Sequence, residues 1–277
     1  MTSVGAALDF LASAPEHTAM LIDFDGTLSR IVTQPELARP LPGVPGVLKR
    51  LANSYGVLGV VSGRPAAWLV EQLELSEGPG SAPAGRTVEA FGLHGIEHAV
   101  GGAVEVAHEA ASWTDAVARA RDEASAAGIV GLVVEDKRYS LTLHWRAAAD
   151  PAAVSRRAVA LGERLAAASG LHSRPGKASI ELIAPIGIDK GTVVAGWADS
   201  PGIERVAFFG DDMSDVPAFD AVDRLAAAGR IAGLKVAVTG LEAPSELLER
   251  ADVVLIGPEA TLQLLEELAV RIGASPG

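Results

Sequence analysis

The 277-residue sequence contains no cysteine. This absence excludes disulfide bonds, zinc sites built on thiolates and a cysteine nucleophile. Basic residues are also few: 23 Lys and Arg stand against 35 Asp and Glu, which gives a formal net charge of −12. Proteins that bind nucleic acids gain affinity by neutralising phosphates with a surplus of Lys and Arg. We therefore expect no nucleic-acid partner.

Long apolar runs are missing too, since no stretch of 18 uninterrupted apolar residues occurs. The N-terminal residues lack the basic and apolar segments of a secretory signal. We expect a cytoplasmic, soluble protein with no membrane partner, while the sequence does not indicate an oligomeric state. Walker and G-x-G-x-x-G patterns are absent as well, which removes the main support for a nucleotide-binding fold.

Short apolar runs alternate with segments of helical periodicity, which is typical of a parallel α/β sheet buried on both faces. Early strands are predicted at 19–23 and 56–61, with helices starting at 42–45 and over 66–73, and a Gly- and Pro-rich surface loop follows at 77–86. Near the C-terminus, strands are predicted at 206–209, 234–238 and 253–256, and helices at 216–228, 245–250 and 259–272.

The middle of the chain has a different pattern, a helix followed by two strands, which occurs twice. The predicted helices are 106–127 and 151–168, and the predicted strands are 130–135, 139–144, 171–173 and 178–183. This order favours an antiparallel sheet covered by helices on one face. We expect a second domain at 103–185, inserted into a core formed by 1–102 and 186–277.

Two carboxylates, Asp23 and Asp25, follow the first predicted strand. Residues i and i+2 of an extended chain point the same way, so both can face a ligand at the carboxyl end of the sheet. A calcium loop does not fit, because its glycine stands at position 6 and Gly26 falls at position 4. A solvated Asp-Gly turn is the simpler alternative.

A second carboxylate cluster, Asp211, Asp212 and Asp215, follows the strand at 206–209. Such oxygen ligands suit Mg²⁺, which takes one or two protein carboxylates and keeps water and substrate phosphate as its other ligands. We assign the metal to Asp211. The sequence leaves open whether Asp212 and Asp215 are further ligands, support the ligands or cap the next helix.

Two other segments can bind a phosphate. Ser62 and Gly63 offer a hydroxyl and backbone N–H groups at a helix start, and Lys190 offers a positive charge at another. Each alone is ordinary surface chemistry. Together with the carboxylates they form a coherent phosphate and metal site.

His94, Glu97 and His98 fit H-x-x-E-H, a zinc-protease pattern that requires a helix. The surrounding residues are Gly-rich and β-prone. In a strand the two histidines would lie about 13 Å apart, too far to share one ion. We therefore interpret His94 and Glu97 as a loop that contacts substrate, with a solvated turn as the alternative.

The predicted hairpins of the inserted domain carry acids and bases. Glu135 and Lys137 lie at the first hairpin, and Lys177 and Glu181 lie at or after the second. Polar turns are usually only solvated, but these residues could hydrogen-bond the hydroxyls of a sugar.

Four segments in this order resemble the motifs of the haloacid dehalogenase superfamily of phosphohydrolases: Asp23-Phe24-Asp25-Gly26-Thr27, Ser62-Gly63-Arg64, Lys190 and Gly210-Asp211-Asp212. Finer features are similar to the trehalose-6-phosphate phosphatase family: His94-Gly95-x-Glu97, Glu135-Asp136-Lys137, His144-Trp145-Arg146, Glu181 and Asp189-Lys190-Gly191. The likeness spans residues 23–219.

This resemblance implies a Rossmann-like core with a parallel sheet, an inserted α/β cap and Mg²⁺ as cofactor. It implies that Asp23 is the nucleophile and Asp25 the general acid/base, and that Glu135, Lys137 and Glu181 bind sugar hydroxyls. The metal ligands expected are Asp23, Asp25, Asp211 and Asp212. The other residues expected to bind substrate are Thr27, Ser62, Gly63, Arg64, His94, Glu97, Lys177 and, with a catalytic role, Lys190.

We therefore expect hydrolysis of trehalose 6-phosphate through an aspartyl-phosphate. The alternatives are a phosphatase for another sugar phosphate and a catalytically silent regulator that binds a sugar phosphate.

Overall fold

The chain forms two compact units. The structure, a computed structural model, describes residues 2–76, 87–240 and 244–273. Unit 1 comprises Met1–Val32, Leu37–Glu105 and Ile188–Gly277, and unit 2 comprises Thr33–Glu36 and Val106–Gly187. The surface loop expected at 77–86 lies outside the described residues.

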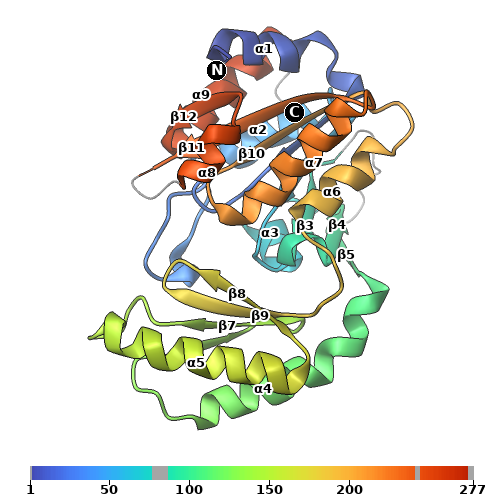
Figure 1. Cartoon of the computed structure of the whole chain (residues 1–277). Coiled ribbons are helices and arrows are strands. Elements are labelled where there is room, and N and C mark those ends of the chain that lie inside the picture. Colours follow the sequence, from blue (N-terminus) through green and yellow to red (C-terminus); the bar gives the residue numbers. More distant parts are fainter. Residues whose placement is uncertain (1, 77–86, 241–243, 274–277) are drawn as a thin grey trace. The chain divides into compact units, whose positions relative to one another are not determined.

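Unit 1 contains an eight-stranded sheet of order β12-β11-β10-β1-β2-β3-β4-β5 (Figure 1). Neighbours from β12 to β3 run parallel, and β4 pairs antiparallel with β3. The strands are β1 (Thr18–Ile22), β2 (Val57–Val61), β3 (Glu89–Gly92), β4 (Glu97–Val100), β5 (Ala103–Val106), β10 (Arg205–Gly210), β11 (Ala232–Thr239) and β12 (Val253–Ile256). The predicted α/β class with a mainly parallel sheet is confirmed.

Helices cover both faces of this sheet. They are α1 (Val4–Ser13), α2 (Val44–Ala52), α3 (Ala66–Gln72), α6 (Lys190–Ala198), α7 (Val216–Ala227), α8 (Ser245–Arg250) and α9 (Gly257–Arg271), with 3₁₀ turns η1 (Pro15–His17), η2 (Pro35–Leu37), η3 (Leu93–Gly95) and η5 (Met213–Asp215). One hydrophobic cluster joins α1, α2, α3 and α9 to the sheet, and another joins α6, α7 and α8 to it. Among helices of the described residues, none has the length and apolar character needed to cross a bilayer.

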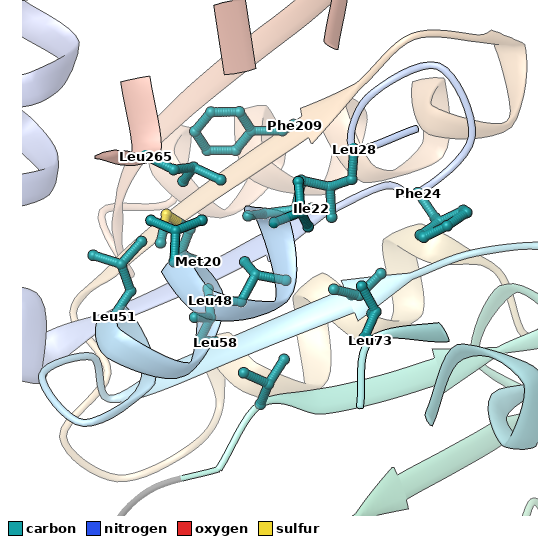
Figure 2. Packing of buried hydrophobic residues seen from close by; sticks show 14 of the residues in the cluster. Met20, Ile22, Phe24, Leu28, Leu48, Leu51, Leu58, Leu73, Phe209 and Leu265 are labelled. Carbon is teal, nitrogen blue, oxygen red and sulfur yellow. The ribbon is translucent and has the colours of Figure 1, made fainter. Parts of the chain in front are cut away.

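Strand β1 is buried on both faces, as its unbroken apolar run predicts. Met20 and Ile22 belong to the cluster under α2 and α9, which Figure 2 shows, whereas Ala19 and Leu21 belong to the cluster under α6 and α7. Burial on both faces holds β1 between the two helix layers. It therefore sets the position of Asp23, which follows β1 directly.

Unit 2 contains a four-stranded antiparallel sheet of order β6-β7-β9-β8 with two helices. Its elements are η4 (His108–Trp113), α4 (Thr114–Ala126), β6 (Val133–Asp136), β7 (Ser140–His144), α5 (Pro151–Ser169), β8 (His172–Gly176) and β9 (Ser179–Ile183). The helix predicted at 106–127 is wrong in its first part: Val106 ends strand β5, and the α-helix begins only at Thr114. The alternation of Val104, Glu105 and Val106 fits the strand period of two.

The two faces of the small sheet differ in character. Leu141 and Leu143 of β7, with Ile180 and Leu182 of β9, form a hydrophobic cluster with α4 and α5, which lie side by side in Figure 1. Because side chains alternate along a strand, the residues between them face the opposite side. Most of those residues are polar, namely Ser140, Thr142, His144, Ser179 and Glu181, whereas Ile183 is apolar.

The core of unit 1 predicts a stability difference between two leucines. Leu48 is fully buried in the cluster of Figure 2, whereas Leu37 is 56% exposed. We expect Leu48→Ala to lower the free energy of unfolding by about 2–5 kcal/mol, and Leu37→Ala to change it by less than about 0.5 kcal/mol. Urea denaturation measures both, and equal losses would contradict the assignment of the core.

Candidate active site

The candidate site lies at the carboxyl ends of three neighbouring parallel strands. Asp23 follows β1, Asp211 follows β10 and Ser62 follows β2, and the strand order β10-β1-β2 places these three ends side by side. The backbone N–H of Asp23 donates to the Phe209 carbonyl at 2.9 Å, which carries the pairing with β10 one residue past β1. Ligands of open α/β sheets bind at this edge.

Two glycines allow the loops after β1 and β10 to approach closely. Gly26 has φ +87°, and a Cβ there would lie 2.1 Å from Asp211 Oδ2. A Cβ on Gly210 would lie 2.3 Å from Asp215 Cγ. Real Cβ atoms essentially never approach so closely. The acidic residues can therefore come together only because glycine, which has no side chain, occupies these two positions.

A buried lysine joins the two loops. Lys190 is the first residue of α6, whose N-terminus is capped by the Asp189 side chain. Its ammonium donates to Asp23 Oδ1 at 2.5 Å and to Asp215 Oδ1 at 2.7 Å. At most 5% of any of these three side chains is exposed. Such charges persist in the interior only because they are paired.

The electrostatics of this group reflect an excess of negative charge. Burial raises the pKa of the Asp23 carboxyl well above its ordinary value, Lys190 opposes this rise, and the nearby aspartates increase it. Burial lowers the pKa of Lys190, but Asp215, Asp23 and Asp212 outweigh it, so the pKa lies above its usual value. Burial also raises the pKa of Asp215. One cation therefore does not balance the carboxylates around it.

The carboxylates divide into two roles. Oxygens of Asp23, Asp211 and Asp215 lie within 4.8 Å of one another. Asp215, however, already accepts from Lys190 and, through Oδ2, from the backbone N–H groups of Asp211 and Asp212 at 2.9 and 3.0 Å. Asp212 caps η5, where its Oδ1 accepts from the backbone N–H and hydroxyl of Ser214 at 2.8 and 2.7 Å.

We take Asp23 and Asp211, whose carboxylate oxygens lie within 4.8 Å of each other, as the candidate metal ligands. Two hard oxygen donors, with Asp211 packed against the backbone of Gly26, fit Mg²⁺, which requires few protein carboxylates. The excess negative charge fits a divalent cation as well.

Thr27 and Ser62 offer hydroxyls beside this cluster. Thr27 is fully buried, and its Oγ1 has no hydrogen-bond partner among the described residues. Ser62 is 1% exposed, and its Oγ accepts from the backbone N–H of Arg64 at 3.2 Å. A buried hydroxyl without a partner is costly, and Thr27 Oγ1 is therefore a group that a ligand can stabilise by a hydrogen bond.

Asp25 is held by Arg64 through two hydrogen bonds. Arg64 Nε donates to Oδ2 and an Nη to Oδ1, both at 2.8 Å. The guanidinium also lies 4.8 Å from the ring centre of Trp68. Arg64 was expected from the sequence to bind substrate. In the structure it pairs with Asp25, the expected general acid/base.

The residues of the H-x-x-E-H pattern lie on two elements, His94 in turn η3 and Glu97 and His98 in strand β4. His94 lies in turn η3 with φ 60°, and a Cβ on Gly63 would be 3.0 Å from its Nε2, so its ring lies against the loop after β2. Glu97 accepts from the backbone N–H of Ala66 at 2.7 Å, at the start of α3. His98 stacks on Phe91 at 4.4 Å between ring centres.

Three of the expected sugar-binding residues come together on unit 2. The Lys137 ammonium lies 3.3 Å from Glu181 Oε1 and 3.8 Å from Glu135 Oε2. Lys177 lies elsewhere in the hairpin between β8 and β9, where its carbonyl accepts from Arg146 at 3.0 Å.

Comparisons with known proteins decide the family. A family model for trehalose-phosphatases matches residues 21–247. The chain belongs to the trehalose-phosphatase family. It is 35% identical over 218 residues to the trehalose-phosphate phosphatase of Mycobacterium marinum, a match that covers 74% of this chain and 51% of that protein. The chain thus spans about half the length of this relative.

Solved structures show the same fold. The C-terminal domain of Candida albicans trehalose-6-phosphate phosphatase aligns with TM-score 0.72 and 22% identity over 97% of each chain. A haloacid dehalogenase-like hydrolase from Bacteroides thetaiotaomicron aligns with TM-score 0.58 and 15% identity over 91% of this chain and 99% of that one. The chain therefore shares its overall fold with these two structures.

The sequence analysis assigned no role to two residues that contact the expected sugar-binding carboxylates in this trehalose-phosphatase family member. His144 Nε2 lies 2.8 Å from Glu135 Oε2, and Ser140 Oγ donates to Glu181 Oε1 at 3.1 Å. Both orient carboxylates that were expected to bind sugar. The signal was the alternation of polar residues at 140, 142 and 144, which places them on one face of a strand.

The buried lysine predicts a stability effect. Lys190→Met leaves two buried carboxylates without their cation and should destabilise the protein by about 3–5 kcal/mol. Lys235→Met is the matched control, because Lys235 is also buried but pairs with one half-exposed partner, Asp223. We expect a smaller loss there in urea denaturation. A Lys190→Met loss no larger than that of the control would contradict the dependence on Lys190.

The division of the carboxylates predicts their response to metal. At about 100 times its dissociation constant, Mg²⁺ should stabilise the protein by roughly 2.7 kcal/mol. Asp211→Asn should abolish this gain, whereas Asp212→Asn should keep it, because asparagine caps a helix as well as aspartate does. Thermal unfolding with and without Mg²⁺ measures both. Loss of the gain in Asp212→Asn would instead make Asp212 a ligand.

Proposed function

We propose that this chain hydrolyses trehalose 6-phosphate to trehalose and inorganic phosphate. The observation that carries this proposal is the buried carboxylate Asp23, held by Lys190 beside Asp211 in a chain of the trehalose-phosphatase family. A carboxylate is a suitable nucleophile for phosphoryl transfer, because an aspartyl-phosphate splits one difficult displacement into two easier ones.

In the first step, Asp23 attacks phosphorus. Lys190 occupies Oδ1, so we assign the attack to Oδ2. A bond forms between Oδ2 and phosphorus, the bond from phosphorus to the sugar oxygen breaks, and Asp25 gives that oxygen a proton. Lys190, the Thr27 hydroxyl and the loop of Ser62 and Gly63 stabilise the charge on the phosphoryl oxygens.

In the second step, water attacks the phosphorus of the aspartyl-phosphate. Asp25 takes a proton from the water, phosphate leaves and the Asp23 carboxylate is restored. Because Arg64 engages both oxygens of Asp25 in this structure, both steps require Arg64 to release at least one of them. A released Arg64 can bind the phosphoryl group, as its expected role requires.

The carboxylates of Asp23 and Asp211 and the backbone carbonyl of Asp25 would hold Mg²⁺, which would supply electrostatic stabilisation of the phosphoryl oxygens. Phosphate-monoester hydrolysis needs accelerations of up to about 10²¹, which is why several sources of positive charge are combined.

The sugar is bound by polar residues of unit 2. Glu135, Lys137 and Glu181 form a group of charged side chains with both acceptors and donors for sugar hydroxyls. We retain Lys177, His94 and Glu97 as further substrate contacts.

Two other functions remain as outcomes of one experiment. With Mg²⁺ and a panel of sugar phosphates, phosphate release should show the highest kcat/KM for trehalose 6-phosphate. A higher value for another sugar phosphate would change the substrate. Binding without any turnover would indicate a regulator, in which Asp25 would have no acid/base role.

The assignment of Asp23 as nucleophile predicts how activity changes when one of its carboxylate oxygens is replaced by an amide nitrogen. Asp23→Asn should lower kcat by at least about 10³-fold, since the amide is a poor nucleophile. Asp9→Asn is the matched control, because Asp9 is 76% exposed and forms a surface ion pair with Arg271. Phosphate release measures both. Full activity in Asp23→Asn would reject the aspartyl-phosphate mechanism.

A further inference from the structure

A row of four side chains crosses the polar face of the small sheet: Glu135, Thr142, Glu181 and Arg174. In the strand register, Thr142 of β7 lies directly opposite Glu135 of β6 on one side and Glu181 of β9 on the other. Neighbouring strands are about 4.8 Å apart, so each carboxylate lies one strand away from the threonine. Thr142 therefore stands at the centre of the group expected to bind sugar.

Both carboxylates of this row are already oriented by other residues. His144 holds Glu135 Oε2 at 2.8 Å. Ser140 and Lys137 donate to Glu181 Oε1 at 3.1 and 3.3 Å. The hydroxyl of Ser140 is therefore used within the protein, although it lies on the same face of the same strand as Thr142.

Thr142 differs from these neighbours. The residue is 4% exposed, and its Oγ1 is buried with no hydrogen-bond partner among the described residues. It lies on the face of β7 opposite the hydrophobic cluster, which contains Leu141 and Leu143. A buried hydroxyl that makes no hydrogen bond destabilises the folded protein, so each such group requires an explanation.

The chemistry of a sugar hydroxyl supplies that explanation. Ionised carboxylates only accept hydrogen bonds, so Glu135 and Glu181 can bind the proton of a sugar hydroxyl but cannot satisfy its lone pairs. A sugar oxygen between them also needs donors, and a threonine hydroxyl is one such donor beside the Lys137 ammonium. The Lys137 ammonium already lies against both carboxylates.

We propose that Thr142 binds a sugar hydroxyl of the substrate through Oγ1 and contributes to sugar specificity, an inference that rests on the function proposed above. The hydroxyl stays unpartnered in the protein alone and completes the hydrogen bonding of a sugar oxygen held between Glu135 and Glu181.

The experiment compares Thr142→Val and Thr142→Ser with wild type. Valine keeps the shape and removes the hydroxyl, so it should lower kcat/KM for trehalose 6-phosphate about three- to tenfold. It should also raise the melting temperature by roughly 2 °C, because an unpartnered buried hydroxyl is removed. Serine keeps the hydroxyl and should retain most of kcat/KM.

Thr261→Val is the matched control. Thr261 of α9 is also fully buried, and its Oγ1 likewise has no hydrogen-bond partner within the described residues. This substitution should raise the melting temperature to a similar extent and leave kcat/KM unchanged. An equal loss of kcat/KM in Thr261→Val would overturn the assignment to Thr142.

Product inhibition tests whether the loss of kcat/KM in Thr142→Val comes from weaker binding of the sugar or of the phosphate. Thr142→Val should raise the inhibition constant of trehalose by the same factor by which kcat/KM falls, and leave that of inorganic phosphate unchanged. Unchanged kcat/KM in Thr142→Val, or an equal loss in Thr142→Ser, would overturn the proposal. A wild-type protein that hydrolyses no sugar phosphate would instead reject the proposed function, and calorimetry of trehalose binding would then compare the same variants.

Discussion

The buried ammonium of Lys190 is the interaction on which the site of unit 1 depends. It joins Asp23, at the end of β1, to Asp215, which lies after β10. These residues are far apart in the sequence, and the hydrophobic layers on both faces of the sheet bring their elements together. Apolar burial sets the strand ends, and the lysine allows carboxylates to persist there. Without that cation, the same packing would force unpaired charges into a low-dielectric interior.

The charge around Asp23 matters more for substrate binding than the net charge of the whole chain. A net charge of −12 cannot attract an anionic substrate, and the cluster around Asp23 carries more carboxylates than Lys190 balances. A divalent cation at Asp23 and Asp211 would offset much of this negative charge where a phosphoryl group must bind. The lack of cysteine fits the same picture, because the proposed nucleophile is a carboxylate that can also bind a hard metal ion.

Strands β1, β2, β10, β11 and β12 of unit 1 were predicted because strands in a sheet buried on both faces are continuous apolar runs, as in β1. Strands β3, β4 and β5 were not predicted. The same reasoning failed at Val106, where a short alternating segment fits the end of a strand as well as the start of a helix. It also could not separate Asp212 from Asp215. Both are aspartates near the start of a helix, and only the paths of their loops decide that one caps η5 while the other accepts from Lys190. The pairing of Asp25 with Arg64 likewise depends on the distance between two loops, which no spacing in the sequence records.

Two hydroxyls on one strand of the small sheet differ in their hydrogen bonding. Ser140 and Thr142 occupy alternate positions of one strand, so their types and spacing suggest the same role for both. The register shows that they differ: Ser140 donates to Glu181, whereas Thr142 has no partner among the described residues. The Thr27 hydroxyl of unit 1, beside the acidic cluster, also has no hydrogen-bond partner among the described residues. A partner within the fold would stabilise each hydroxyl but would also occupy it. A binding site must keep some polar groups unpartnered at a cost in stability, because only those groups can form new hydrogen bonds with a ligand.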